Sequence, residues 1–156
     1  KGAYVAGLSV KDVIDVFEIR NALERLAVSL AAERVTDDDL EKLERLLVKL
    51  SETWKEGDVE TWAELDSQFH NLIYQFSRND RLIQMMNNIM EQLSRYRMIC
   101  LSRLEVRQNS IEEHKKMVEA MAERNAPMAM EAATEHLRNT EDSLIELLKE
   151  KQVGIE

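Results

Sequence analysis

Residues 13–31 read VIDVFEIRNALERLAVSLA, and this stretch decides the fold class. Its apolar side chains recur at steps of three and four residues, which is the spacing of one face of an α-helix. Arg20 and Glu24 fall on that same face. We therefore predict a long helix over residues 11–34 that buries one mostly apolar face.

Comparable periodicity continues along the chain and is interrupted by turn and capping signals. In order, these are Thr36 with Asp39, Gly57-Asp58, Asn79-Asp80, Ser110 with Glu113, and Asn125-Ala126-Pro127. A hydroxyl residue followed three positions later by an acidic one is typical of a capping box, and proline is favoured at the first helical position. Ser110 should thus open a fifth helix, and Pro127 a last helix that runs to about Lys149. The fold class predicted is all-α, an antiparallel bundle of about six to seven helices.

The composition agrees with a helical domain. Only 4 glycines and 1 proline occur in 156 residues, so few positions favour a hairpin turn. No apolar run approaches the roughly 20 residues that span a bilayer, and no signal peptide is recognisable, so no membrane association is expected. Cys100 is the single cysteine, which favours a reducing, cytoplasmic location. The 8 methionines are interpreted as flexible core residues.

The charge distribution argues against direct contact with nucleic acid. The net charge is −9, and an acidic surface repels a phosphate backbone. The positive residues that cluster in sequence are Arg95, Arg97, Arg103 and Arg107. Their spacing points around a helix rather than along one face, so we do not expect this segment to form a surface for DNA or RNA.

All three histidines lie on apolar faces of the predicted helices. Asp66 and His70 are four residues apart and therefore share one helix face. His114 and His136 lie on the buried faces of the fifth and the last helix. A buried carboxylate without a partner is costly, and a buried imidazole has two ring nitrogens to satisfy. These four side chains are candidates for one shared site.

A single divalent metal ion would satisfy all four side chains. It would pair with the carboxylate and accept a lone pair from each neutral imidazole. Three nitrogens and one oxygen suit Zn²⁺, Ni²⁺, Mn²⁺ or Fe²⁺, and leave coordination positions open for water or an organic carboxylate. The alternative is that each histidine is hydrogen-bonded separately in the core. Asp66, His70, His114 and His136 are thus candidate metal ligands, for catalysis or for ligand sensing.

Several segments between about residues 12 and 145 resemble a known family. They are FEIRNALE (17–24), LAAER (30–34), ELDSQFH (64–70), EH (113–114) and EHL (135–137). The candidate ligands are separated by intervals of 4, 44 and 22 residues, much as in that family. The sequence thus resembles the FCD domain, the C-terminal effector-binding domain of FadR-type GntR transcriptional regulators.

The resemblance implies a domain organisation and partners. Residues 11–150 would form one FCD domain that binds the effector and dimerises, without enzymatic activity. Residues 1–10 would be the remnant of a winged-helix wing and its linker, and residues 151–156 a C-terminal tail. The DNA-reading helix would then lie upstream, and a homodimer would bind operator DNA through it.

The resemblance also implies roles for individual residues. The four candidate ligands would hold the metal, most often zinc or nickel, and a small carboxylate effector would complete its coordination. Arg20 is a candidate contact of the effector carboxylate, and the alternative is that it forms a solvated or structural ion pair. Weaker candidates for effector binding are Asn88, Arg95 and Asn139, and for each of these the alternative is a surface or capping role.

Two other functions remain open at this point. A metalloenzyme could use an open metal position, but its activated water would need a general base, and no spare carboxylate lies at an obvious spacing. A purely structural dimerisation module would carry the histidines only as core residues.

Overall fold

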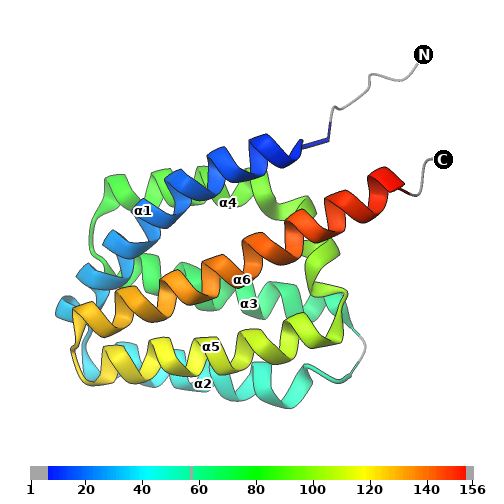
Figure 1. The fold of residues 1–156 in the computed structure, drawn as a ribbon. Helices are drawn as coiled ribbons and strands as arrows, with labels where there is room; N and C mark the ends of the chain where they lie inside the picture. The colour runs from blue at the N-terminus through cyan, green and yellow to red at the C-terminus, as the bar shows by residue number, and fades with distance from the viewer. Residues whose placement is uncertain (1–6, 57, 154–156) are drawn as a thin grey trace.

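The computed structural model describes residues 7–56 and 58–153, and all regular secondary structure in them is helical. The six helices are α1 (Val10–Arg34), α2 (Asp37–Thr53), α3 (Val59–Phe76), α4 (Asp80–Leu101), α5 (Leu104–Ala122) and α6 (Ala126–Val153). Each helix runs opposite to the one before it, so the predicted antiparallel all-α bundle is confirmed (Figure 1). None of the described helices has the length and apolar character needed to cross a membrane.

The predicted domain limits fall close to the ends of the described chain. α1 begins at Val10, one residue before the predicted limit, and the segment assigned to a wing and linker lies largely outside the described residues. α6 continues to Val153, past the predicted end near Lys149, and the rest of the predicted tail is likewise outside them.

Side-chain caps explain where four of the helices begin. The side chains of Ser9 and Thr36 each accept a hydrogen bond from the backbone N–H of an aspartate three residues later. The side chain of that aspartate in turn accepts a hydrogen bond from the backbone N–H of the capping residue. Asp58 accepts from the first turn of α3, and Asn79 accepts from Leu82 N at 3.1 Å at the start of α4. The Thr36 capping box and the helix starts after Asp58 and Asn79 are thus confirmed, whereas Gly57 lies outside the described residues.

The predicted start of the fifth helix at Ser110 is wrong. α5 begins at Leu104, and its N-cap Arg103 makes no side-chain capping hydrogen bond. Ser110 and Glu113 therefore lie inside a continuous helix, where they are buried. The last helix also begins one residue earlier than predicted, because Asn125 is its cap and accepts from Met128 N at 3.1 Å.

Two hydrophobic clusters fill the bundle. The larger one includes Ala27, Trp62 and Met117, and the smaller one includes Phe17 and Leu144. Along α1 and α6, buried polar side chains separate the two clusters. We call the following set the polar layer: Arg20, Glu24, Asp66, His70, Arg97, Arg107, Ser110, Glu113, His114 and His136. It draws on every helix except α2.

Candidate metal and effector site

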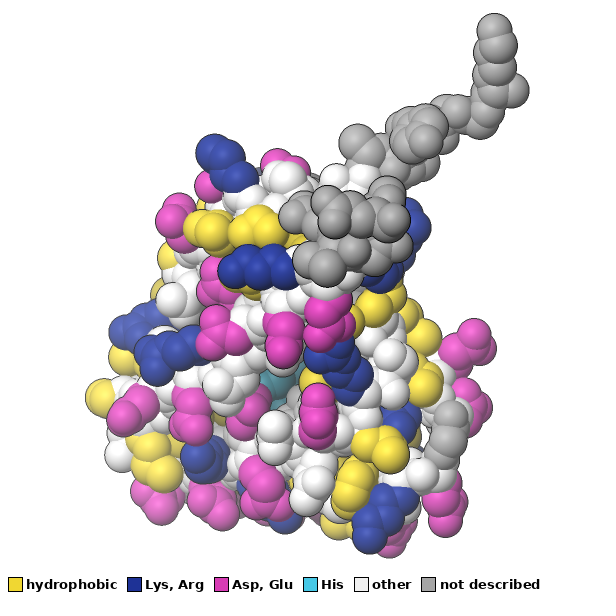
Figure 2. Space-filling model, turned by 45° about the vertical axis from the view of Figure 1, so that its right-hand side comes forward, with side chains coloured by type: hydrophobic (Ala, Val, Ile, Leu, Met, Phe, Trp, Pro, Cys, Tyr) yellow, Lys and Arg dark blue, Asp and Glu magenta, His cyan; other side chains and the backbone are white. Residues whose placement is uncertain are grey.

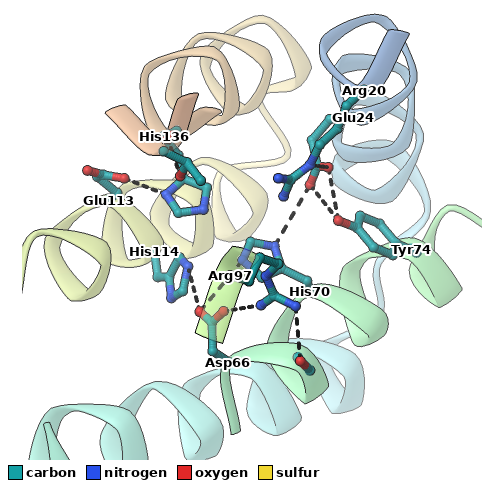
Figure 3. Close-up of polar contacts among 11 residues, drawn as sticks. Arg20, Glu24, Asp66, His70, Tyr74, Arg97, Glu113, His114 and His136 are labelled. Carbon is teal, nitrogen blue, oxygen red and sulfur yellow. Dashed lines mark hydrogen bonds and ion pairs between the residues drawn. The ribbon is translucent and has the colours of Figure 1, made fainter. Parts of the chain in front are cut away.

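The three histidines meet in the middle of the polar layer. They come from α3, α5 and α6, and their side chains are 2%, 0% and 5% exposed for His70, His114 and His136. One nitrogen of each ring lies within 4.8 Å of one nitrogen of the other two. The ring centroids are 5.0 to 5.2 Å apart, and the rings face a common space (Figure 3). The predicted convergence of the imidazoles is therefore present in the fold.

Asp66 lies beside two of these rings. Its Oδ1 is 3.5 Å from His114 Nε2 and 3.7 Å from His70 Nε2. Its Oδ2 accepts a hydrogen bond from the Arg97 guanidinium, which also donates to Ser67 Oγ at 3.1 Å. Arg97 thereby fixes the carboxylate so that the remaining oxygen faces the imidazoles.

Glu113 orients the third ring. One of its oxygens accepts a hydrogen bond from His136 Nδ1, and the other accepts from Asn139 Nδ2 at 2.9 Å. Because Nδ1 of His136 is engaged, its Nε2 is the nitrogen with a free lone pair. Carboxylates that hold the far side of a histidine in this way are typical partners of metal-binding imidazoles.

A second buried carboxylate lies on the α1 side. Glu24 accepts hydrogen bonds from Tyr74 Oη at 2.9 and 3.0 Å, and its Oε1 is 3.8 Å from His70 Nδ1. Arg20 Nε lies 3.6 Å from the other oxygen of Glu24. The guanidinium of Arg20 stands over the ring of Phe17 at 5.3 Å, but its Nε and Nη1 make no hydrogen bond in the described structure.

The electrostatic environment keeps two of the imidazoles neutral. Burial, followed by the neighbouring imidazoles and arginines, lowers the pKa of His70 well below its usual range. Burial also lowers the pKa of His114 to about 3, although Asp66 opposes this shift. Neutral rings keep the lone pairs that a metal ion requires.

The unsatisfied atoms of the cluster fit a metal ion. Both ring nitrogens of His114 and Nδ1 of His70 are buried without a hydrogen-bond partner among the described residues. Such groups are rare because leaving them unpaired costs about 1–3 kcal/mol each. The alternative that each histidine is separately hydrogen-bonded describes His136 but neither of the other two.

Two of the four predicted effector residues are brought to the polar layer and two are not. Arg20 is 1% exposed, and Asn139 reaches the layer through Glu113. Asn88 is exposed on α4, where it accepts from Gln92 at 3.4 Å, and Arg95 is exposed as well. Arg97, two residues further along, is the α4 arginine that points inward. It lies on the apolar face of α4, and this position in the sequence could have identified it as an inward-facing residue.

Sequence spacing indicated no spare carboxylate for the histidines, but the fold places two beside them. Glu24 and Glu113 are both buried beside them. They come from α1 and α5, so their sequence distance from Asp66 gave no indication of proximity. Glu24 is held by Tyr74, and Glu113 by His136 and Asn139, so each already has a structural partner.

A cleft between α5 and α6 leads toward the polar layer. It has a volume of about 200 Å³, and its lining includes Ser110, Glu113 and Asn139. Figure 2 shows imidazole surface at the bottom of a hollow, surrounded by acidic and basic side chains. The cluster is therefore buried but close to the surface on this side.

Comparison with known proteins gives one family. The family model described as the FCD domain matches residues 15–139. The HTH-type transcriptional regulator LutR of Bacillus subtilis is 34% identical over 139 residues, which are 86% of this chain and 63% of LutR. The HTH-type transcriptional repressor GlaR of Escherichia coli is 29% identical over 145 residues, covering 88% of this chain and 66% of GlaR. The chain thus spans about two thirds of the length of these relatives.

Solved structures share the fold. Escherichia coli McbR/YncC superimposes with a TM-score of 0.84 at 22% identity, over 94% of this chain and 77% of that one. Streptococcus agalactiae GntR superimposes with a TM-score of 0.71 at 27% identity, over 84% of this chain and 58% of that one. An FCD domain described as metal-free gives 0.74 at 21% identity, over 92% and 99%. LutR and GlaR are named as transcriptional regulators, so these relatives do not support the metalloenzyme alternative. The chain belongs to the FCD domain family.

Proposed function

We propose that this chain is the sensing domain of a cytoplasmic GntR-type transcriptional regulator, in which a divalent metal ion and a small organic acid bind together in the polar layer. The observation that carries the proposal is the convergence of three buried imidazoles, of which His70 and His114 have unsatisfied nitrogens and lie beside Asp66. Asp66, His70, His114 and His136 would hold the metal, with zinc the first candidate and nickel, manganese or iron the others.

The remaining residues of the layer would support and complete the site. A bound metal would supply an open coordination position for a carboxylate oxygen of the acid. Glu113 orients His136, and Arg97 orients Asp66, so both proposed ligands are held by neighbours. Arg20 offers a buried guanidinium with free donor atoms to a carboxylate.

In the whole protein, the acid would change operator binding by an N-terminal helix-turn-helix segment, with two copies acting as a homodimer. The relatives named above are HTH-type regulators, which supports this assignment. The thermodynamic requirement is that the acid binds the DNA-competent and DNA-incompetent arrangements with different affinities. Titration of the full-length protein on its operator with candidate acids tests this step, and it fails if no acid alters DNA affinity.

The metal site is tested by comparing the wild type with His114→Ala. Zinc at 100 times its dissociation constant should raise the free energy of unfolding of the wild type by about 2.7 kcal/mol, and a chelator should reverse this. The variant should lose the zinc-dependent increment. Lys115→Ala, at the adjacent half-buried position, is the matched control and should retain it. The proposal fails if zinc stabilises His114→Ala as much as the wild type, or if the wild type binds no stoichiometric metal.

A further inference from the structure

Arg107 is a buried cation without a partner. Its side chain projects from α5 and is 3% exposed, and its Nε and Nη1 have no hydrogen-bond partner among the described residues. Arg20 has the same unpaired donor atoms but lies near Glu24, and Arg97 pairs with Asp66. For Arg107 the described chain offers no carboxylate at ion-pair distance. An unpaired buried charge costs several kcal/mol, so an anion beside Arg107 would be strongly stabilised.

Arg107 lies on the same buried face of α5 as the histidine cluster. It precedes His114 by seven residues, which places the two side chains on nearly the same side of the helix with a rise of about 10 Å between them. Ser110 lies between them, is buried, and lines the cleft between α5 and α6. Glu113, which contacts His136, lines the same cleft. The cleft thus opens beside this stretch of α5, although neither Arg107 nor a histidine lines it.

The charges of the polar layer indicate how many negative charges a ligand should carry. Its three arginines are matched by three carboxylates, which are Glu24, Asp66 and Glu113. The metal ion of the proposed function would add two positive charges, and an imidazole that ligates a metal ion adds none. A monocarboxylate would neutralise only one of those two charges. A dianion would neutralise both.

We propose that the effector is a dianionic organic acid, with one carboxylate at the histidine cluster beside Arg20 and a second anionic group paired with Arg107. The second group is a carboxylate or a phosphoryl group, since a guanidinium binds either in the same bidentate way. This inference rests on the proposed metal-dependent function and specifies the ligand class of that site.

Calorimetric titration of the zinc-loaded 156-residue chain tests the proposal. The ligands are malonate, succinate, glutarate and adipate, each compared with the monocarboxylate of the same carbon number, and 3-phosphonopropionate. At least one dianion should bind tenfold or more tightly than its monocarboxylate counterpart. A preference for the phosphonate over the dicarboxylates would identify the second group as phosphoryl. Zinc content after each titration shows that the acids have not extracted the metal.

Substitutions then assign the preference to Arg107. Arg107→Met should reduce the preference for the dianion to threefold or less while leaving monocarboxylate affinity unchanged. Arg81→Met is the matched control, because Arg81 is exposed on α4. If Arg107→Met does not fold, Arg107→Lys replaces it in the test. This variant retains the charge and should keep the preference for the dianion. The selectivity of the wild type for dianions over monocarboxylates still tests the proposal in that case.

Two results would overturn the inference while leaving the proposed function intact. One is that every dianion binds the wild type within threefold of its monocarboxylate counterpart. The other is that Arg107→Met weakens both classes of acid equally. If no acid of either class binds the zinc-loaded chain, the proposed function itself fails.

Discussion

The larger hydrophobic cluster and the polar layer lie side by side in one bundle but differ in how they are stabilised. In the cluster, side chains such as Trp62 and Leu43 are buried with other apolar residues, and the Trp62 indole donates to the Leu50 carbonyl at 3.1 Å. In the polar layer, Arg107 and His114 are equally buried but keep atoms without partners. The cluster is thus complete in the chain alone, whereas the polar layer keeps unpaired polar atoms that the proposed metal ion and acid would satisfy.

The largest effect is expected from a substitution in the cluster. Trp62→Ala should lower the free energy of unfolding by about 3–5 kcal/mol, because it removes a fully buried indole and leaves a cavity. The loss should be the same with zinc and with a chelator, as measured by urea unfolding followed by circular dichroism. Trp54→Ala, at a half-buried position, should cost less. A loss that depends on zinc would show that the two regions are energetically coupled.

A smaller effect, from pH, should be confined to the polar layer. The unfolded chain protonates its histidines near pH 6.5, whereas the pKa of buried His114 is about 3 and that of His70 is also lowered. The metal-free protein is therefore most stable above pH 6.5 and loses stability as the pH falls. His114 alone should account for about 2 kcal/mol between pH 7 and pH 5.

The measurement is urea unfolding of the metal-free protein at both pH values. His114→Ala should reduce the pH-dependent loss by about that amount, while Trp62→Ala should leave it unchanged. An identical loss in the wild type and in His114→Ala would contradict the assignment. With zinc present the loss should be larger, because protons compete with the metal for the imidazoles.

The smallest of these effects concerns the partner of His136. Glu113→Gln should weaken zinc binding about tenfold, or about 1.4 kcal/mol, because the neutral amide no longer polarises the imidazole. Competition with a chromophoric chelator measures this change. Glu112→Gln is the adjacent control, since Glu112 is exposed and pairs with Lys115 at 2.8 Å. If both variants bind zinc equally well, Glu113 does not tune the site.

Periodicity predicted most of the fold but not the break between α4 and α5. Apolar spacing and caps such as Thr36 are local, so they are readable in the sequence. The real break follows Leu101 and has no glycine, proline or side-chain cap, since Arg103 makes no capping hydrogen bond. Ser110 and Glu113 imitate a capping box, but the helix has already begun six residues earlier. Tertiary packing rather than a local signal sets this boundary.

The candidate site was predictable to the extent that its residues lie on apolar faces. Asp66 and the three histidines do, and so does Arg97, which is the arginine of α4 that reaches the polar layer, whereas Arg95 is exposed. The partnerships of Glu24 and Glu113 were not predictable, because they depend on which faces of α1, α3, α5 and α6 meet. An alternation of buried polar residues along one helix identifies candidates, but the neighbouring helices determine their partners.

The unbroken course of α1 has a mechanical consequence. The helix runs from Val10 to Arg34 and passes through the smaller cluster, the polar layer and the larger cluster (Figure 1). Arg20 lies ten residues from its start, about 15 Å along a straight rod that the Ser9 capping box closes at the end. A rod of this kind has no hinge to absorb a displacement at Arg20. A displacement of the α1 backbone at Arg20 would therefore be carried to the start of the helix at Val10.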